Sequence, residues 1–176
     1  MKSKKSSAFY ELFLSEVQDI YWAENHLAKA LTKMSKKANN PELAAAFEEH
    51  QDATLMHVER LNKVFELLGE KPEAKKCAAM AGLLEESAEV IKDTEKDPFV
   101  LDVGLIICAQ KVEHYEISAY GSLRTLAQTL GKKDIAELFQ ATLDEEGETD
   151  KKLTQIAVGF INEEALEEGL SAGKGK

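Results

Sequence analysis

Apolar residues recur every three to four positions through four long stretches of the chain, a spacing typical of amphipathic helices. Proline and glycine bound these stretches. Pro41 suits the first turn of a helix, and Gly69 and Gly131 suit the position just after one. The pattern therefore predicts long helices over approximately residues 7–38, 41–68, 98–130 and 133–162.

The connections between these helices predict how they pair. The links around Asn40 and Gly131 are short and favour antiparallel hairpins, whereas residues 70–96 form a long link. That link contains the apolar segment CAAMAGLLEESAEVI, which predicts a short extra helix. Two hairpins joined by one long crossover indicate an all-α, ferritin-like four-helix bundle, although loop lengths also allow an up-and-down bundle. We expect a disordered tail at 1–6, the bundle at 7–163 and a flexible tail at 164–176.

Each apolar seam is interrupted near its middle by polar side chains that can bind metals. The interruptions lie at similar distances from the hairpin turns, so in a bundle they would meet in one layer. A buried carboxylate must be paired, protonated or metal-bound, and no lysine or arginine lies on the seams at this level. The interrupting residues are Glu24 in the first helix, His50, Thr54 and His57 in the second, Glu113 and Glu116 in the third, and Glu146 and Thr149 in the fourth.

Several carboxylates with imidazole at one centre suit iron or manganese. Their mutual repulsion favours two ions at the centre. Glu113 and Glu116 are neighbours on one helix face, so one of them can bridge the ions while the other binds terminally or supports a ligand. His50 and His57 can instead be hydrogen-bonded core histidines, and Tyr120 can either donate to a ligating carboxylate or simply pack.

Composition and charge limit the classes of binding partner and the cellular compartment that we expect. The net charge of −10 and the pI of about 5.0 argue against a nucleic-acid surface, which needs a basic face. No signal peptide or membrane span is evident, so we expect no membrane partner. Two cysteines, Cys77 and Cys108, do not resemble a secreted disulfide framework, which predicts a cytoplasmic protein.

Several segments together resemble the YciF-like (YciE/YciF) family of bacterial stress proteins, over about residues 9–157. These segments are DIYWAENHLAKAL, EEHQDATLMHVERL, CAAMAGLLEE, CAQKVEHYEISAYG and TLDEEGETDKKLT. The resemblance implies a ferritin-like fold, related in architecture to rubrerythrins and bacterioferritins. It also implies a homodimer and a site for two metal ions.

The resemblance carries over to the site position by position. Glu24 takes the place of the first-helix glutamate, Glu113 or Glu116 that of the third, and Glu146 that of the fourth. His57 matches the histidine of a second-helix Glu-x-x-His pair. However, Thr54 replaces the glutamate of that pair, and Thr149 stands where the fourth helix would carry a histidine. The additional ligand candidates nearby are His50, the best placed, and Asp52, Glu145 and Asp150.

These features predict a stress-response protein with an iron or manganese site that reacts with dioxygen or peroxide. The alternatives are metal sequestration without turnover, and a dimeric structural or regulatory protein whose site has degenerated. The missing Glu-x-x-His pairs favour the last alternative, and the sequence leaves open whether the protein is an enzyme.

Overall fold

The computed structural model describes residues 7–173, which contain helices and no strand. Four long helices form the bundle. Of the two shorter helices, one lies in the long link between the hairpins and the other follows the second hairpin. The elements are α1 (Ala8–Lys37), α2 (Pro41–Leu68), α3 (Ala78–Thr94), α4 (Pro98–Thr129), α5 (Lys133–Ile156), a π-helical turn (Ala157–Ile161) and α6 (Asn162–Gly173). The four predicted helices and the predicted extra helix are therefore confirmed.

Local chemistry explains where the helices begin and end. The side chains of Ser7, Asn40 and Asp97 accept hydrogen bonds from the first turns of α1, α2 and α4, as N-cap residues do. Gly69 and Gly131 follow α2 and α4 with φ of 66° and 74°, a region that glycine enters without steric cost. These residues set the ends of the helices, with Asn40 and Gly131 at the two hairpin turns and Gly69 at the start of the long link.

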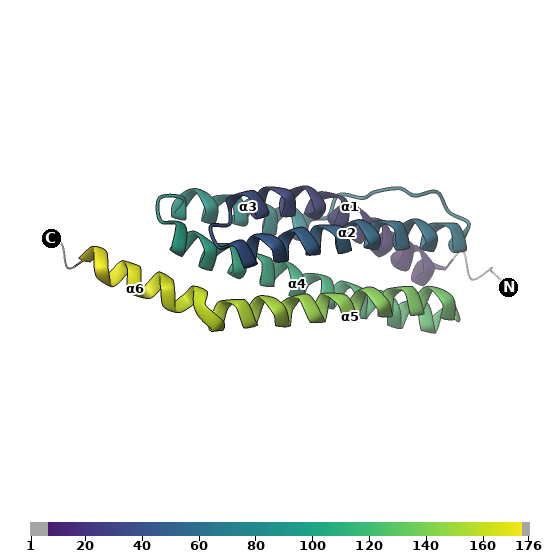
Figure 1. Cartoon of the computed structure of the whole chain (residues 1–176). Helices are drawn as coiled ribbons and strands as arrows, with labels where there is room; N and C mark the ends of the chain where they lie inside the picture. The colour runs from purple at the N-terminus through teal and green to yellow at the C-terminus, as the bar shows by residue number, and fades with distance from the viewer. Residues whose placement is uncertain (1–6, 174–176) are drawn as a thin grey trace.

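The bundle has ferritin-like connectivity (Figure 1). α1 packs against α2 and α4, and α5 packs against α2 and α4, so α2 and α4 lie on a diagonal. The link after α2 and the helix α3 bring the chain back along the bundle, and α2 and α4 therefore run in the same direction. In an up-and-down bundle these consecutive helices would be antiparallel neighbours, so the crossover arrangement is confirmed.

A buried carboxylate ties the first hairpin to the other half of the bundle. Asp102 on α4 is 2% exposed, and its two oxygens accept hydrogen bonds from the backbone N–H groups of Asn39 and Asn40, each at 2.8 Å. Those donors lie in the turn between α1 and α2. Asp102 therefore fixes the level at which the two hairpins pack against each other.

The C-terminal segment departs from the expected flexible tail at 164–176. The chain stays helical from α5 through the π-helical turn to Gly173, with a bend between α5 and α6 (Figure 1). The physical reason is local, because residues 156–168 lack proline and are rich in the good helix formers Ala, Leu and Glu. The expected tail at 1–6 lies outside the described residues, as do residues 174–176.

The core is a single apolar cluster along the bundle axis, interrupted at mid-length by charged groups. No described helix is long and apolar enough to cross a membrane.

Candidate metal centre

Six ionisable side chains from all four bundle helices meet in the interior. Each is at most 3% exposed, and each stands among the buried apolar residues of its own helix. The six residues are Glu24 from α1, His50 and His57 from α2, Glu113 and Glu116 from α4, and Glu146 from α5. The convergence expected from counting along the seams is therefore present in the structure.

These side chains form two clusters with one member in common. In the first, ligand-type atoms of His50, Glu113, Glu116 and Glu146 all lie within 4.8 Å of one another. In the second, the same holds for Glu24, His57 and Glu146. Glu146 therefore belongs to both clusters and would be shared if each cluster held an ion.

Several close approaches within the clusters join imidazole nitrogens to carboxylate oxygens. His50 Nδ1 is 3.2 Å from Glu113 Oε1, and His50 Nε2 is 3.4 Å from Glu146 Oε2. His57 Nδ1 is 2.9 Å from Glu146 Oε1 and 3.4 Å from Glu24 Oε1. Each histidine thus has a nitrogen facing Glu146.

Most of the oxygen and nitrogen atoms that could bind a metal in these six side chains lack a hydrogen bond within residues 7–173. The atoms are both carboxylate oxygens of Glu113, Glu116 and Glu146, Oε2 of Glu24, both ring nitrogens of His50, and Nδ1 of His57. Buried polar groups are nearly always satisfied, because leaving one without a partner costs about 1–3 kcal/mol. So many unsatisfied atoms in one layer fit cation ligands, and the residues present are suited to metal.

The electrostatics of the metal-free layer show how unfavourable the bare charges are. Burial raises the pKa of Glu116 and Glu113 well above the usual glutamate value, and neighbouring carboxylates raise it further. Burial likewise raises the pKa of Glu24, against the effect of His57. Without metal, these carboxylates therefore tend to hold protons.

Glu146 and His57 shift toward their charged forms. Burial works against the charge on Glu146, but the imidazoles of His50 and His57 beside it outweigh burial and lower the pKa of Glu146 to about 2. Burial also disfavours a charged His57, but Glu146 and Glu24 raise the pKa of His57 to about 10. A bound cation would take over the role of the His57 proton, because metal ligands bind in their deprotonated forms.

The outer nitrogen of His57 is held by a carboxylate and an arginine. His57 Nε2 lies 2.8 Å from Glu145 Oε2, and Arg60 donates to both oxygens of Glu145 at 2.5 and 2.7 Å. Histidines that bind metals usually have their second nitrogen fixed in this way. From the sequence, Glu145 was expected only as an additional ligand candidate, and no role was expected for Arg60. The signal available was the spacing of Arg60 and His57, which places both on one face of α2.

Tyr120 plays the supporting part considered from the sequence. Its hydroxyl donates a hydrogen bond to Glu24 Oε1, and the ring is 1% exposed. Burial, with the carboxylate of Glu24 beside it, raises the pKa of Tyr120 well above its usual value. Tyr120 therefore remains a neutral donor that orients Glu24.

Other candidates lie outside both clusters. Asp150 is partly exposed and accepts a hydrogen bond from Gln110 Nε2 at 3.2 Å, with the largely exposed His114 3.4 Å away. Asp52 is exposed on α2. Thr149 is half-buried, and its hydroxyl donates to the backbone carbonyl of Glu145. Asp150 was expected as a ligand, but its carboxylate lies outside both clusters and accepts its hydrogen bond from Gln110 on α4.

The missing Glu-x-x-His pairs do not leave the donor set short. The common ferritin-like pattern supplies four glutamates and two histidines, with one histidine on each of two helices. This centre also has four glutamates and two histidines, but both histidines come from α2, seven residues apart, and two of the glutamates come from α4. The composition of the set is kept while its distribution over the helices differs.

Comparison with known proteins gives a consistent family. The family described as a domain of unknown function, DUF892, matches residues 8–166. Protein YciF of Escherichia coli strain K12 is 44% identical over 156 residues, which cover 88% of this chain and 93% of that protein.

Solved structures agree with this relationship. The crystal structure of the E. coli stress protein YciF matches with a TM-score of 0.83 and 43% identity, over 92% of this chain and 99% of that one. YcfI of Rhodopseudomonas palustris matches with a TM-score of 0.82 and 38% identity, over 88% and 98%. A protein from Xanthomonas campestris pv. campestris, 23% identical with a TM-score of 0.73, shares the fold. The chain therefore belongs to the DUF892 family and is a relative of the stress protein YciF.

Proposed function

We propose that this protein is a stress-response protein that binds two iron or manganese ions inside the bundle and reacts with dioxygen or peroxide. The single observation that carries the proposal is the layer of unsatisfied buried carboxylate and imidazole atoms. The description of the relative YciF as a stress protein supports the physiological setting.

The two clusters suggest how the ligands are divided. His50, Glu113 and Glu116 would hold one ion, Glu24 and His57 the other, and Glu146 would lie between them. Four carboxylates carry four negative charges, which two divalent cations neutralise. This balance removes the carboxylate repulsion that adds to burial in raising the pKa of Glu113 and Glu116 in the metal-free layer.

The bound ions would supply reversible one-electron redox chemistry toward the oxidant. The chain itself orients the ligands and handles protons. Tyr120 keeps Glu24 in place, and Arg60 with Glu145 keeps His57 in place. Glu145 is 40% exposed while His57 is fully buried, so this pair joins the interior to solvent by a hydrogen bond through which a proton can pass.

The test is metal content. Protein purified after growth with iron or manganese, and apo-protein reloaded with either ion, should bind two ions per chain by elemental analysis. Glu146→Gln keeps the side-chain shape but removes the central charge, so it should bind at most one ion. Glu137→Gln, on the exposed side of α5, is the matched control and should bind as the wild type does. A metal-free wild type under both conditions would overturn the proposal.

Sequestration without turnover is the second candidate, because the same buried clusters serve both functions. Peroxide consumption by the loaded protein separates the two. Turnover that is lost in Glu146→Gln and retained in Glu137→Gln supports the redox function. Stoichiometric metal binding without any peroxide consumption supports sequestration.

A further inference from the structure

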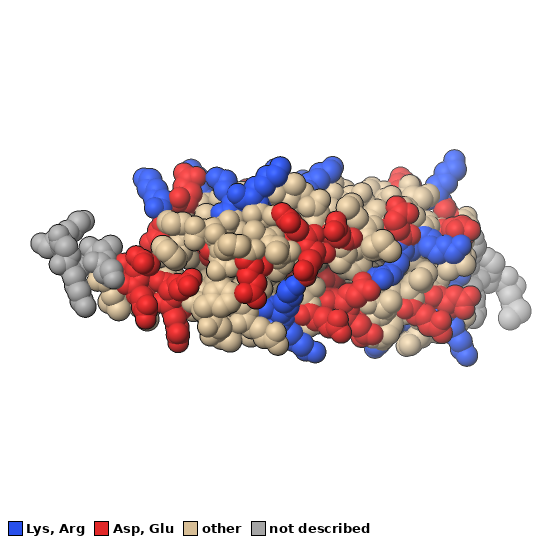
Figure 2. Space-filling model, in the orientation of Figure 1, with Lys and Arg blue, Asp and Glu red and all other residues tan. Residues whose placement is uncertain are grey.

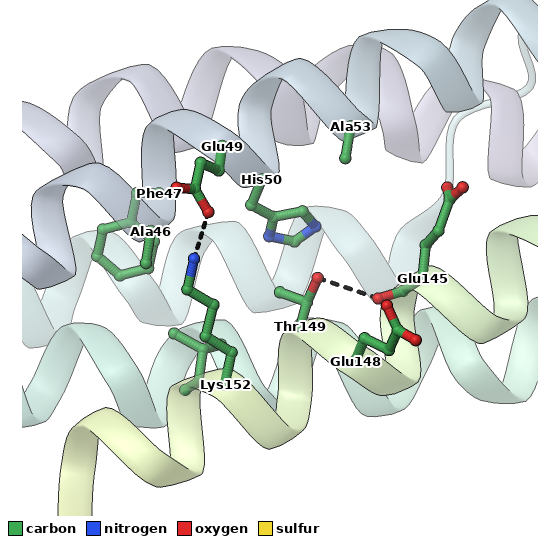
Figure 3. Close-up of a pocket in the computed structure, with 10 residues that line it drawn as sticks. Ala46, Phe47, Glu49, His50, Ala53, Glu145, Glu148, Thr149 and Lys152 are labelled. Atoms are coloured by element: carbon green, nitrogen blue, oxygen red, sulfur yellow. Dashed lines mark hydrogen bonds and ion pairs between the residues drawn. The ribbon is translucent and has the colours of Figure 1, made fainter. Parts of the chain in front are cut away.

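A pocket of about 260 Å³ lies on the side of the bundle between α2 and α5, and it reaches the candidate metal centre (Figure 3). Its apolar wall includes Phe47 and Leu153, and its polar wall includes Glu145 and Glu148. His50, one of the six centre residues, also lines it. The pocket therefore connects the surface to a side chain of the first cluster.

His50 is well suited to receive a cation from this pocket. It is 3% exposed, and neither ring nitrogen has a hydrogen bond within the described residues. Glu113 and Glu146 lie next to those nitrogens, at 3.2 and 3.4 Å. A cation bound first by His50 would then meet carboxylate oxygens without crossing apolar core.

Small side chains account for the opening. Ala53 lies one turn after His50 on α2, and Thr149 lies one turn after Glu146 on α5, both lining the pocket (Figure 3). The common ferritin-like pattern has a histidine at the position of Thr149. A histidine there would project more volume between the two helices. The smaller Thr149 stands at that position here, and it lines the pocket.

The rim carries a modest negative charge. Lys152 pairs with Glu49, and Arg60 pairs with Glu145, while Glu148 is exposed with no ion pair among the described residues. A single unneutralised carboxylate at the mouth attracts a divalent cation without trapping it.

We propose that the pocket between α2 and α5 is the entrance through which divalent metal ions reach the interior, with His50 as their first ligand. The inference rests on the proposed metal-binding function. The groove on the opposite side of the bundle, between α1 and α4, is lined by Glu16, Asp19 and Ala119 among others, and by none of the six centre residues. This groove is therefore the control site for variants that block the pocket between α2 and α5.

The first test measures how fast the metal-free protein takes up cobalt(II), a visible-light probe, by stopped-flow absorbance. Ala53→Leu fills the proposed entrance and should slow uptake at least about tenfold. Removal of cobalt by a chelator should slow equally, so the equilibrium Kd stays unchanged. Ala119→Leu fills the opposite groove and should leave both rates at the wild-type values. Slowing by Ala119→Leu but not by Ala53→Leu would place the entrance in that groove and overturn the proposal.

A second variant tests the entrance without relying on the correct folding of Ala53→Leu. Ala53→Cys places a thiol in the pocket, whereas the native Cys77 and Cys108 are buried. Uptake is measured on one folded sample before labelling with a bulky methanethiosulfonate reagent, after labelling, and after release by a reductant. Slowing that reverses on release supports the entrance. An unchanged rate after complete labelling overturns it.

Charge at the mouth gives an independent readout. At low ionic strength, Glu148→Gln should slow cobalt uptake about threefold, and Lys152→Gln should accelerate it by a similar factor, because one charge near the path changes the local cation concentration. Lys151→Gln makes the same change in net charge at an exposed residue that does not line the pocket. An equal effect of Lys151→Gln and Lys152→Gln would attribute the change to overall charge and contradict the proposal.

Failure of the inference and failure of the proposed function give different results. If the wild type binds no cobalt, iron or manganese at equilibrium, the metal site itself is wrong. If the wild type binds metal and the blocked variants bind it at the wild-type rate, the site stands and the entrance is wrong.

Discussion

Glu146 illustrates how burial and partners decide the state of one side chain. It is fully buried, yet two histidines lower its pKa and hold it ionised. For Glu113 and Glu116 nearby, burial and the neighbouring carboxylates raise the pKa instead. Inward-facing positions such as Glu146 are predictable from the 3.6-residue period. Glu145 and Arg60 were not assigned their role, because they lie off the seams and act through His57.

At this scale, Arg60 provides a prediction. Arg60→Gln should weaken metal binding about 10- to 100-fold, since the partners that orient a ligating histidine have effects of that size. The expected mechanism is that Glu145 is no longer fixed, so His57 loses its orientation. Isothermal titration with manganese measures the Kd. Lys63→Gln, which breaks the exposed Lys63–Glu66 pair on the same helix, is the control, and an equal loss there would contradict the assignment.

Tyr10 provides a prediction on pH. Its hydroxyl donates to Glu70 Oε1 at 3.1 Å, and burial, reinforced by Glu70, raises the pKa of Tyr10 to about 12 from 10. Between pH 10 and 12 the unfolded chain has lost this proton while the folded chain keeps it. The contribution of the Tyr10 proton to the free energy of unfolding is therefore complete below pH 10. Above pH 10 it decreases by at most about 1.4 kcal/mol per pH unit.

Urea unfolding of wild type and Tyr10→Phe from pH 8 to 12 checks this. The stability of the wild type relative to Tyr10→Phe should be constant up to about pH 10 and then decline toward pH 12. A difference that does not change over this range would show that the folded and unfolded states release the proton together.

At the scale of elements, the close contact of α3 with α4 depends on one glycine. A Cβ on Gly104 would lie 2.7 Å from Cγ1 of Val90 on α3, whereas a Cβ on Gly121 of the same helix would meet nothing within 4 Å. Capping residues and breakers made the existence of these helices predictable. Their packing distances were not, because they depend on side chains far apart in sequence.

The two glycines predict opposite effects on stability. Gly104→Ala should lower the free energy of unfolding by about 1–3 kcal/mol, because the crowded methyl group forces α3 away from α4. Gly121→Ala should raise it by about 0.5–1 kcal/mol, because alanine loses less backbone entropy in a helix. Chemical unfolding followed by circular dichroism measures both. Stabilisation by Gly104→Ala would show that α3 does not pack closely on α4.

At the scale of the whole molecule, acidic side chains are spread along the face shown in Figure 2, with lysines and arginines between them. This distribution accords with the acidic pI and lacks, on that face, the basic stripe of a nucleic-acid surface. The homodimer, the absence of nucleic-acid and membrane partners, and the cytoplasmic location expected from the sequence stay predictions. Light scattering of the purified protein tests the homodimer directly.

Metal should stabilise the whole bundle, because the centre joins all four long helices. At a free manganese concentration of 100 times Kd, binding adds about 2.7 kcal/mol, which corresponds to roughly 5–10 °C in Tm for a chain of this size. Calorimetry with manganese or with a chelator measures the shift. Glu146→Gln should show little of it, and an identical Tm of the wild type in both conditions would contradict a metal at this centre.

The sequence by itself determined the helices, their pairing into hairpins, and the level at which polar residues enter the core. These properties follow from periodicity, caps and link lengths, which are local. Only the tertiary structure decided that His50 completes the donor set, that Asp150 lies outside it, and that Asp102 ties the hairpins together. Those outcomes depend on how each helix is rotated about its axis and on which distant side chains then come within bonding range.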